Sequence, residues 1–233
     1  MRLSNRSLDV ITIDKDVANN RIAKNIAAFF GNADTIKIIN LGVGIPTLVS
    51  NYIQNENVFI QAENGMLGVG SIATGDDIDP QLINAGRQPV KQTPGCSFFD
   101  SSTSFGMIRG GHIDATVLGA FEVDEAGNIA NWIIPNGKML GVGGAMDLVV
   151  GAKQVIVAMT HTNKGEPKLI KRCTLPVTGF GEVDIVVTEF AIFHFEHEGI
   201  KLTAIAPEVS VDDVRNMTKF DFSISAELGV MLS

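Results

Sequence analysis

The segment 58–68 places a single carboxylate between an apolar run and a series of glycines. Residues 58–62 read Val-Phe-Ile-Gln-Ala, which is typical of a β-strand, and Glu63 follows, directly before an Asn-Gly turn. In open α/β folds, ligands bind in the crevice outside the carboxyl ends of the strands. Glu63 is therefore a candidate to meet a ligand at the edge of a sheet. The competing interpretation is a solvated acid that only begins a turn.

Glycine-rich turns that follow or flank apolar segments form a second group of candidates. Glycine lets the backbone come close to a ligand and point amides at it, which suits a phosphate or an oxyanion. The spacing does not match the dinucleotide-binding fingerprint, because the third glycine expected after Gly42 and Gly44 is replaced by Thr47. Tight turns without a ligand explain each segment equally well. The segments are Gly42-x-Gly44, Gly65-x-x-Gly68-x-Gly70 and Gly141-x-Gly143-Gly144.

The histidines do not predict a metal site. His194 and His197 lie in a strand-like region, where a spacing of three places side chains on opposite faces of a sheet. No cysteine or carboxylate cluster completes a set of ligands around them. We interpret His112 and His161 as core or loop residues. Arg109, close to His112 in the sequence, either approaches an anionic ligand or forms a buried ion pair.

Length and composition favour one domain, residues 1–233, with apolar surface kept for a partner. Hydrophobic residues make up 45% of the 233 residues and charged residues 19%, and the mean hydropathy is +0.21. A chain of this length buries a sizeable core, and its share of hydrophobic residues is high for a free monomer. The net charge of -8 argues against nucleic acid or an anionic membrane as the main partner.

The chain shows no sign of secretion or membrane insertion. No apolar h-region follows the first seven residues, so we expect no secretory signal. No apolar stretch reaches the ~20 residues that a membrane-spanning helix requires. Cys96 and Cys173 are too few and too far apart for a disulfide framework. We expect a cytoplasmic protein with two reduced thiols.

Helix and strand patterns alternate in the first third of the chain. This alternation favours an α/β fold with an open, mostly parallel sheet covered by helices. Asp14 or Asp16 is placed to cap the first helix. The predicted elements are a helix over 16–30, a strand over 35–41, a helix over 47–53 and a strand over 58–62.

The sequence after the first third of the chain predicts added β-hairpins and one short helix. A turn over 124–128 joins two apolar runs, which makes a hairpin there. Ser210 and Asp213 form a capping pair at the start of the last helix. The region 75–111 has no regular pattern. The predicted strands cover 115–123, 129–134, 155–159, 184–195 and 200–206, and the helix covers 211–218.

The segment 62–68, Ala-Glu-Asn-Gly-Met-Leu-Gly, resembles the active-site signature of family I coenzyme A (CoA) transferases. That signature is Ser-Glu-Asn-Gly followed by two aliphatic residues and a small one. Further segments are similar to the β subunit of two-subunit 3-oxoacid, acetate or butyrate–acetoacetate CoA-transferases, in the same order along nearly the whole chain. They are 40–52, 83–86, 97–100, 107–114, 117–119, 127–128, 131–132, 141–149 and 175–179.

The resemblance implies an enzyme with a ping-pong mechanism and a CoA-transferase or sugar-phosphate-isomerase type of fold. Glu63 is then the nucleophile, which carries CoA as a glutamyl thioester between an acyl-CoA and a short-chain acid of the acetate, butyrate or acetoacetate class. Amides of Gly143, Gly144 or Ala145 would bind the oxyanion and CoA. No metal or cofactor is implied, since the CoA thioester is a substrate. The implied partner is an α subunit, in an α2β2 heterotetramer.

Two positions depart from the family pattern. Ala62 replaces the usual serine, and Asn136 stands where a proline is usual before Gly-Lys. Because neighbouring strand residues point to opposite faces, we expect Ala62 to tune the chemistry and not to abolish it.

Two other functions are compatible with this type of fold. A non-catalytic regulatory or ligand-binding subunit is disfavoured by the presence of Glu63 together with both glycine loops. A sugar-phosphate isomerase is disfavoured because no basic cluster for a phosphate accompanies this glutamate.

Overall fold

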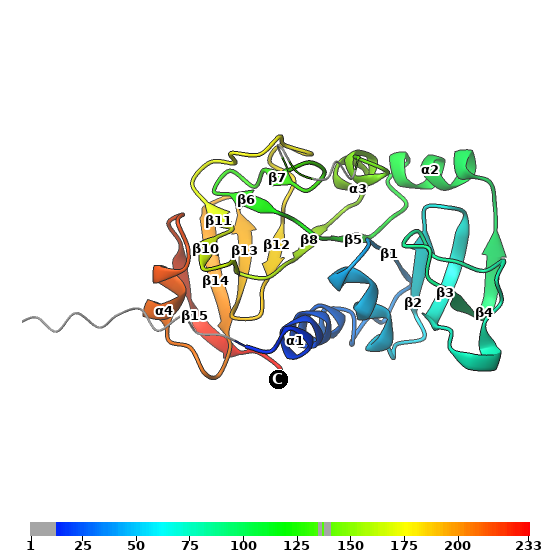
Figure 1. Cartoon of the computed structure of the whole chain (residues 1–233), viewed down its shortest axis with the longest axis horizontal. Helices are drawn as coiled ribbons and strands as arrows, with labels where there is room; N and C mark the ends of the chain where they lie inside the picture. The colour runs from blue at the N-terminus through cyan, green and yellow to red at the C-terminus, as the bar shows by residue number, and fades with distance from the viewer. Residues whose placement is uncertain (1–12, 135–136, 138–140) are drawn as a thin grey trace, which may run out of the picture.

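The computed structural model describes residues 13–134, 137 and 141–233, so that Asn136 and the segment before residue 13 lie outside the described residues. Figure 1 shows a long, twisted sheet that runs through the molecule. It has ten strands in the order β15-β14-β13-β12-β8-β5-β1-β2-β3-β4. These are β1 (Lys37–Leu41), β2 (Val58–Ala62), β3 (Met66–Ile72), β4 (Val90–Phe98), β5 (Ala115–Leu118), β8 (Val155–Ala158), β12 (Ile185–Val187), β13 (Ala191–Glu196), β14 (Gly199–Ile205) and β15 (Ser223–Val230).

The centre of the sheet is parallel and its flanks are hairpins. Strands β2, β1, β5, β8 and β12 pair in parallel, in that order. Antiparallel pairing adds β3 and β4 on one side, and β13 and β14 on the other. The central strands are almost fully buried, as expected for a parallel sheet covered on both faces. The predicted α/β architecture with added hairpins is confirmed.

Helices lie on opposite sides of the sheet. Figure 1 shows α1 (Lys15–Ala28) along the lower side, and α2 (Ser101–Arg109) and α3 (Ala145–Gly151) along the upper side. Asp14 caps α1 by accepting hydrogen bonds from two backbone amides of its first turn, so one of the two predicted caps is confirmed. The remaining helical elements are α4 (Val211–Asn216) and the 3-10 helices η1 (Ile45–Asn51) and η2 (Gly75–Asp77).

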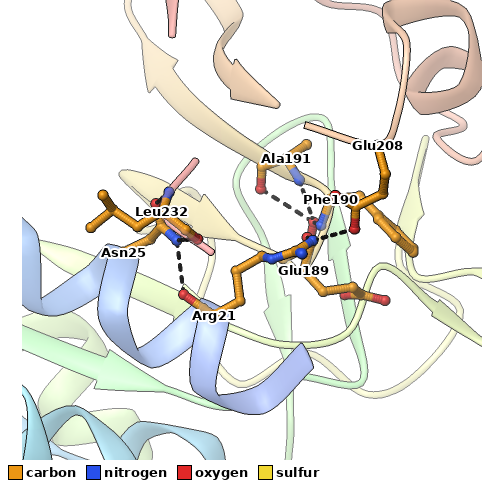
Figure 2. A network of polar contacts seen from close by, with 8 residues as sticks. Arg21, Asn25, Glu189, Phe190, Ala191, Glu208 and Leu232 are labelled. Atoms are coloured by element: carbon orange, nitrogen blue, oxygen red, sulfur yellow. Dashed lines mark hydrogen bonds and ion pairs between the residues drawn. The ribbon is translucent and has the colours of Figure 1, made fainter. Parts of the chain in front are cut away.

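Polar contacts hold α1 against the carboxyl-terminal half of the chain (Figure 2). Arg21 Nη1 donates to the backbone oxygen of Glu189 at 3.0 Å and to Glu208 Oε1 at 2.5 Å. Asn25 exchanges two hydrogen bonds with the backbone of Leu232. Arg21 is buried, whereas the Glu208 side chain is 38% exposed, and the contacts of Arg21 tie three distant segments together.

Two smaller sheets cover one end of the molecule, and they correct a prediction. The apolar run 115–123 is two strands and not one, because the chain leaves the large sheet after Leu118 and enters a second sheet at Glu122. The hairpin predicted around 124–128 is confirmed, but its second strand is short. The second sheet contains β6 (Glu122–Asp124), β7 (Ile129–Ala130) and β11 (Leu169–Ile170), and the third contains β9 (Thr162–Asn163) and β10 (Glu166–Pro167).

Candidate active site

Glu63 lies in the tight turn between β2 and β3. The last strand pair before this turn joins Ala62 to Met66, so Glu63 is the first residue of a three-residue hairpin loop. Gly65 has φ 121°, and a Cβ added there would lie 2.1 Å from the backbone oxygen of Phe99. Only glycine satisfies both conditions. The predicted Asn-Gly turn is confirmed, and it places Glu63 half-buried at the carboxyl end of β2.

A buried asparagine holds the side chain of Glu63. Asn40, near the carboxyl end of the neighbouring strand β1, is fully buried. Its Nδ2 donates to Glu63 Oε2 at 3.2 Å and to Gln61 Oε1 at 2.7 Å. The register places Asn40 directly opposite Gln61. The sequence interpretation did not single out Asn40 or Gln61, although a polar residue inside an apolar strand was the available signal.

Gly144, in the second glycine loop, lies beside Glu63. A Cβ added to Gly144 would lie 3.6 Å from Glu63 Cγ and 3.1 Å from Phe105 Cζ. Gly143 has φ 51°, and no described residue beyond its chain neighbours lies within 4 Å of a Cβ added there. The amide of Ala145 donates to the backbone oxygen of Val142 at 3.0 Å, so it is already engaged. Within the described residues, the amides of Gly143 and Gly144 donate to no group.

Helices α2 and α3 pack against each other beside the site, where Phe105 of α2 lies next to Gly144 at the start of α3. Asp100 caps α2 by accepting from the Thr103 amide at 2.7 Å, which lowers the pKa of its carboxyl group. Arg109 Nε donates to Asp147 Oδ1 at 2.7 Å and links α2 to α3. The side chain of Arg109 is 66% exposed, so of the two interpretations offered for this arginine the ion pair is present, but on the surface and not buried.

The first glycine loop follows β1 on the same edge of the sheet. The Gly42 amide donates to the Val117 oxygen at 2.8 Å, and an added Cβ would approach that oxygen to 3.1 Å. Thr47 Oγ1 donates to the backbone oxygen of Gly42 at 3.0 Å. Thr47, which breaks the dinucleotide-binding spacing, therefore closes this loop onto itself. Glu63 and both glycine loops lie at the edge where the parallel strands end.

Two of the histidines lie among buried or aromatic side chains. His161 is fully buried, with Nδ1 2.9 Å from Thr188 Oγ1 and Nε2 2.9 Å from Thr218 Oγ1. Burial lowers the pKa of His161 to about 3, so the ring is neutral near pH 7. His194 contacts Phe29 edge to face. The described part of the chain contains no group of histidine, cysteine and carboxylate side chains that could hold a metal ion.

Both cysteines are free thiols in the structure. Desolvation raises the pKa of Cys96, and it raises the pKa of Cys173 to about 12 together with the nearby carboxylates of Asp124 and Glu122. Neither thiol is thus activated as a nucleophile. In the parts of the chain that are described, no helix is long and apolar enough to cross a membrane.

Comparison with known proteins decides the family of this site. The family profile described as Coenzyme A transferase matches residues 19–216. The chain belongs to the coenzyme A transferase family. It is 48% identical to one subunit of a succinyl-CoA:3-ketoacid coenzyme A transferase from Helicobacter pylori, over 80% of this chain and 90% of that protein. It is 45% identical to the β subunit of an Escherichia coli acetate CoA-transferase, over 91% of this chain and 96% of that protein.

Solved structures of CoA-transferases share the fold. An acyl-CoA transferase of Escherichia coli O157:H7 superposes with a TM-score of 0.70 at 23% identity, over 95% of this chain and 45% of that one. The chain thus spans less than half the length of that protein. Glutaconate coenzyme A-transferase from Acidaminococcus fermentans superposes with a TM-score of 0.65 at 16% identity, over 92% of this chain and 88% of that one. The CoA-transferase family and enzyme class expected from the sequence are confirmed.

Proposed function

We propose that this chain is the β-type subunit of a heteromeric CoA-transferase in which Glu63 carries CoA as a covalent thioester. The observation that carries this proposal is the position of Glu63. Its carboxylate is held by Asn40 at the carboxyl end of a parallel strand, next to Gly144. A carboxylate is a weak nucleophile, so catalysis requires that it be fixed beside donors for the charge that develops.

The proposed first half-reaction moves CoA onto the protein. A carboxylate oxygen of Glu63 attacks the carbonyl carbon of the acyl-CoA thioester, the carbon–sulfur bond breaks, and CoA leaves as a thiolate. The product is a mixed anhydride between the acyl group and Glu63. The thiolate then attacks the glutamyl carbonyl carbon, and the donor acid leaves as a carboxylate. The result is a Glu63–CoA thioester, which conserves the energy of the original thioester.

The proposed second half-reaction is the reverse with another acid. The acceptor carboxylate attacks the Glu63 thioester, the thiolate leaves, and a second anhydride forms. The thiolate attacks the acyl carbon of the acceptor, which releases the new acyl-CoA and restores the Glu63 carboxylate. Atoms and charge balance with the two substrates alone, so the proposal requires neither ATP nor a cofactor.

We assign the oxyanion and the thiol end of CoA to the second glycine loop. The amides of Gly143 and Gly144 suit this role because no group of the described residues accepts from them. Ala145, the third residue of the proposed set, would have to release Val142 first. Losing one donor of an oxyanion hole typically lowers turnover about 10²–10³-fold.

We propose that an α-type subunit docks over this edge, as the names of the relatives imply, in an α2β2 assembly in the cytoplasm. Large apolar side chains on segments next to the Glu63 turn remain exposed, which is unusual for a surface without a partner. Val43 lies in the first glycine loop, Ile83 accepts a hydrogen bond from Asn64, and Phe98 pairs with Met66. Their exposed fractions are 65%, 39% and 57%.

We propose short-chain acids of the acetate, butyrate or acetoacetate class as substrates. The relatives are named for acetate and for succinyl-CoA with 3-ketoacids. The bulky side chain of Phe105, on α2, lies next to Gly144 and Glu63 and would limit the length of the acyl group. Turnover measured with acids of increasing chain length should therefore fall once the acyl chain is longer than that of butyrate or acetoacetate.

The decisive experiment traps CoA on Glu63. The enzyme assembled with its α-type partner is incubated with acyl-CoA and no acceptor acid, and peptides are analysed by mass spectrometry. We expect a CoA adduct on the peptide that contains Glu63, released by hydroxylamine. Glu63→Gln and Glu63→Ala should bind acyl-CoA without forming the adduct. Glu63→Asp should lose about 10²-fold in rate, because a shorter side chain withdraws the carboxylate by about 1 Å.

An adduct on Glu56, Asp76 or Cys96 would show that the nucleophile is assigned wrongly. Transfer that survives in Glu63→Ala would do the same.

A further inference from the structure

Three buried polar residues form a hydrogen-bonded network behind Glu63. Ser104 Oγ accepts from Gln61 Nε2 at 2.7 Å, and Gln61 Oε1 accepts from Asn40 Nδ2 at 2.7 Å. Asn40 Nδ2 also donates to Glu63 Oε2 at 3.2 Å. The network thus runs from Ser104 on α2 to Gln61 on β2, and then through Asn40 on β1 to the hairpin turn. Asn40, Gln61 and Ser104 are each 0% exposed.

Only one orientation of the Asn40 amide is compatible with this network. The single acceptor of Gln61, Oε1, faces Asn40, while its amide nitrogen faces Ser104. Asn40 must therefore present Nδ2 and not Oδ1 to Gln61. If the Asn40 amide were reversed, its oxygen would face Gln61 Oε1 and the Glu63 carboxylate together, which is repulsive. Gln61 Oε1 and the backbone oxygen of Gln61, which lies 3.1 Å from Asn40 Nδ2, thus both keep Nδ2 of Asn40 pointed at the nucleophile.

The orientation of Asn40 is unfavourable for folding. Within the described residues, Asn40 Oδ1 is buried and has no hydrogen-bond partner. A buried acceptor without a partner destabilises a fold, and an apolar residue of similar shape would avoid this. Groups held at the expense of stability are typical of functional sites. Asn40 is therefore placed for Glu63 and not for the core.

We propose that Ser104 and Gln61 are positioning residues that act through Asn40 to hold one oxygen of Glu63, leaving the other oxygen free to attack. This inference rests on the proposed role of Glu63 as the nucleophile. Neither Ser104 nor Gln61 touches the reacting atoms in this scheme. Their contribution is to keep the carboxylate in one orientation, since a displacement of about 1 Å costs roughly 10²-fold in rate.

The test measures the rate of Glu63–CoA adduct formation in a single turnover, with the enzyme assembled with its α-type partner. We expect about 10-fold slower formation in Ser104→Ala and about 10²-fold in Gln61→Met. The affinity for acyl-CoA should stay unchanged in both. Ser104→Thr, which keeps the hydroxyl acceptor, should recover most of the rate lost in Ser104→Ala.

Thr218→Val is the matched control. It also removes one buried side-chain hydrogen bond, the one to His161 Nε2, but it has no link to Glu63 in the contacts of the described chain. It should lower the thermal unfolding midpoint about as much as Ser104→Ala and leave the adduct rate unchanged. An equal loss of rate in Thr218→Val would reduce the role of Ser104 to general stability.

A double substitution separates action through Asn40 from an independent effect. Adding Ser104→Ala to Asn40→Ala should slow adduct formation no further, because the path to Glu63 is already broken. Full multiplication of the two effects contradicts the proposal, as does a wild-type rate in both Ser104→Ala and Gln61→Met. If the wild type itself forms no adduct on Glu63, the proposed function fails. This outcome is distinct from a failure of the positioning network.

Discussion

At the scale of single residues, Gly144 determines how closely the second glycine loop approaches Glu63. Its φ of -87° is accessible to any residue, so contact and not backbone strain makes it sensitive to substitution. In Gly144→Val the new side chain would meet Phe105 and Glu63, since a Cβ alone comes within 3.1 and 3.6 Å of them. We expect turnover to fall at least about 10²-fold while the subunits still assemble.

The control for this substitution is Gly31→Ala. Gly31 is exposed after α1, and an added Cβ makes only one contact, 3.4 Å from Ala28 O. Steady-state kinetics and size-exclusion chromatography of both variants are the measurements. Near-normal turnover in a folded Gly144→Val enzyme would remove this loop from the mechanism.

Gly65 is the residue on which the hairpin turn depends. Gly65→Ala would place a Cβ 2.1 Å from the Phe99 oxygen at a φ of 121°. We expect the free energy of unfolding to fall by at least about 2 kcal/mol, measured by urea denaturation. Gly75 also has a positive φ, but no described residue beyond its chain neighbours lies within 4 Å of a Cβ added there. The free energy of unfolding should therefore fall clearly less in Gly75→Ala. Equal losses would mean that backbone strain, and not the contact with Phe99, requires glycine at position 65.

At the scale of secondary structure elements, His161 links β8 to β12 and α4. Its pKa of about 3 lies below the ordinary 6.5, so the unfolded chain takes up a proton at a higher pH than the folded one. The stability that this histidine contributes is complete above pH 6.5 and is lost as the pH falls toward 3. The slope of this loss approaches 1.4 kcal/mol per pH unit, roughly that of one proton.

Unfolding curves between pH 7 and 4 test this linkage. His161→Leu should lower the stability at pH 7, since Thr188 and Thr218 lose their partner, but should show a shallower fall toward acid. His197→Gln is the control, because His197 is exposed and its replacement should keep the wild-type slope. An unchanged slope in His161→Leu would mean that other groups cause the acid sensitivity.

At the scale of the whole molecule, we expect the isolated chain to be inactive and to gain activity with an α-type partner. The exposed apolar side chains of Val43, Ile83 and Phe98 need a cover, and the proposed mechanism requires that this cover also exclude water from the site. Permanent interfaces of this kind commonly bury more than ~2,000 Å². Activity titrated against added partner, together with light scattering, measures both assembly and turnover. Full turnover by the chain alone as a homo-oligomer would overturn this expectation.

The single-domain organisation of residues 1–233 remains a prediction at this scale. The ten-stranded sheet and the contacts of Arg21 and Asn25 with the carboxyl-terminal half favour one cooperative unit. Calorimetric unfolding should therefore give one transition, with equal calorimetric and van't Hoff enthalpies. Two separated transitions would divide the chain into two units.

Features that depend on a few neighbouring residues were predictable from the amino-acid sequence. The strand 58–62, the Asn-Gly turn after Glu63 and the capping box of Ser210 with Asp213 are local, so their residues carry the information. The family also follows from ordered short motifs. Helix α2 was missed because Ser-Ser-Thr-Ser at its start has low helix propensity, although Asp100 is a typical N-cap.

Features that depend on how strands align were decided only by the tertiary structure. A continuous apolar run cannot show that the chain changes sheets between Leu118 and Glu122, because both halves are buried. The contact between Asn40 and Glu63 exists because the parallel register places Asn40 opposite Gln61, on the face that carries Glu63. Gly144 reaches Glu63 through the packing of α2 on α3. The sequence singles out Glu63 as the candidate carboxylate, whereas long-range packing supplies the groups that orient it.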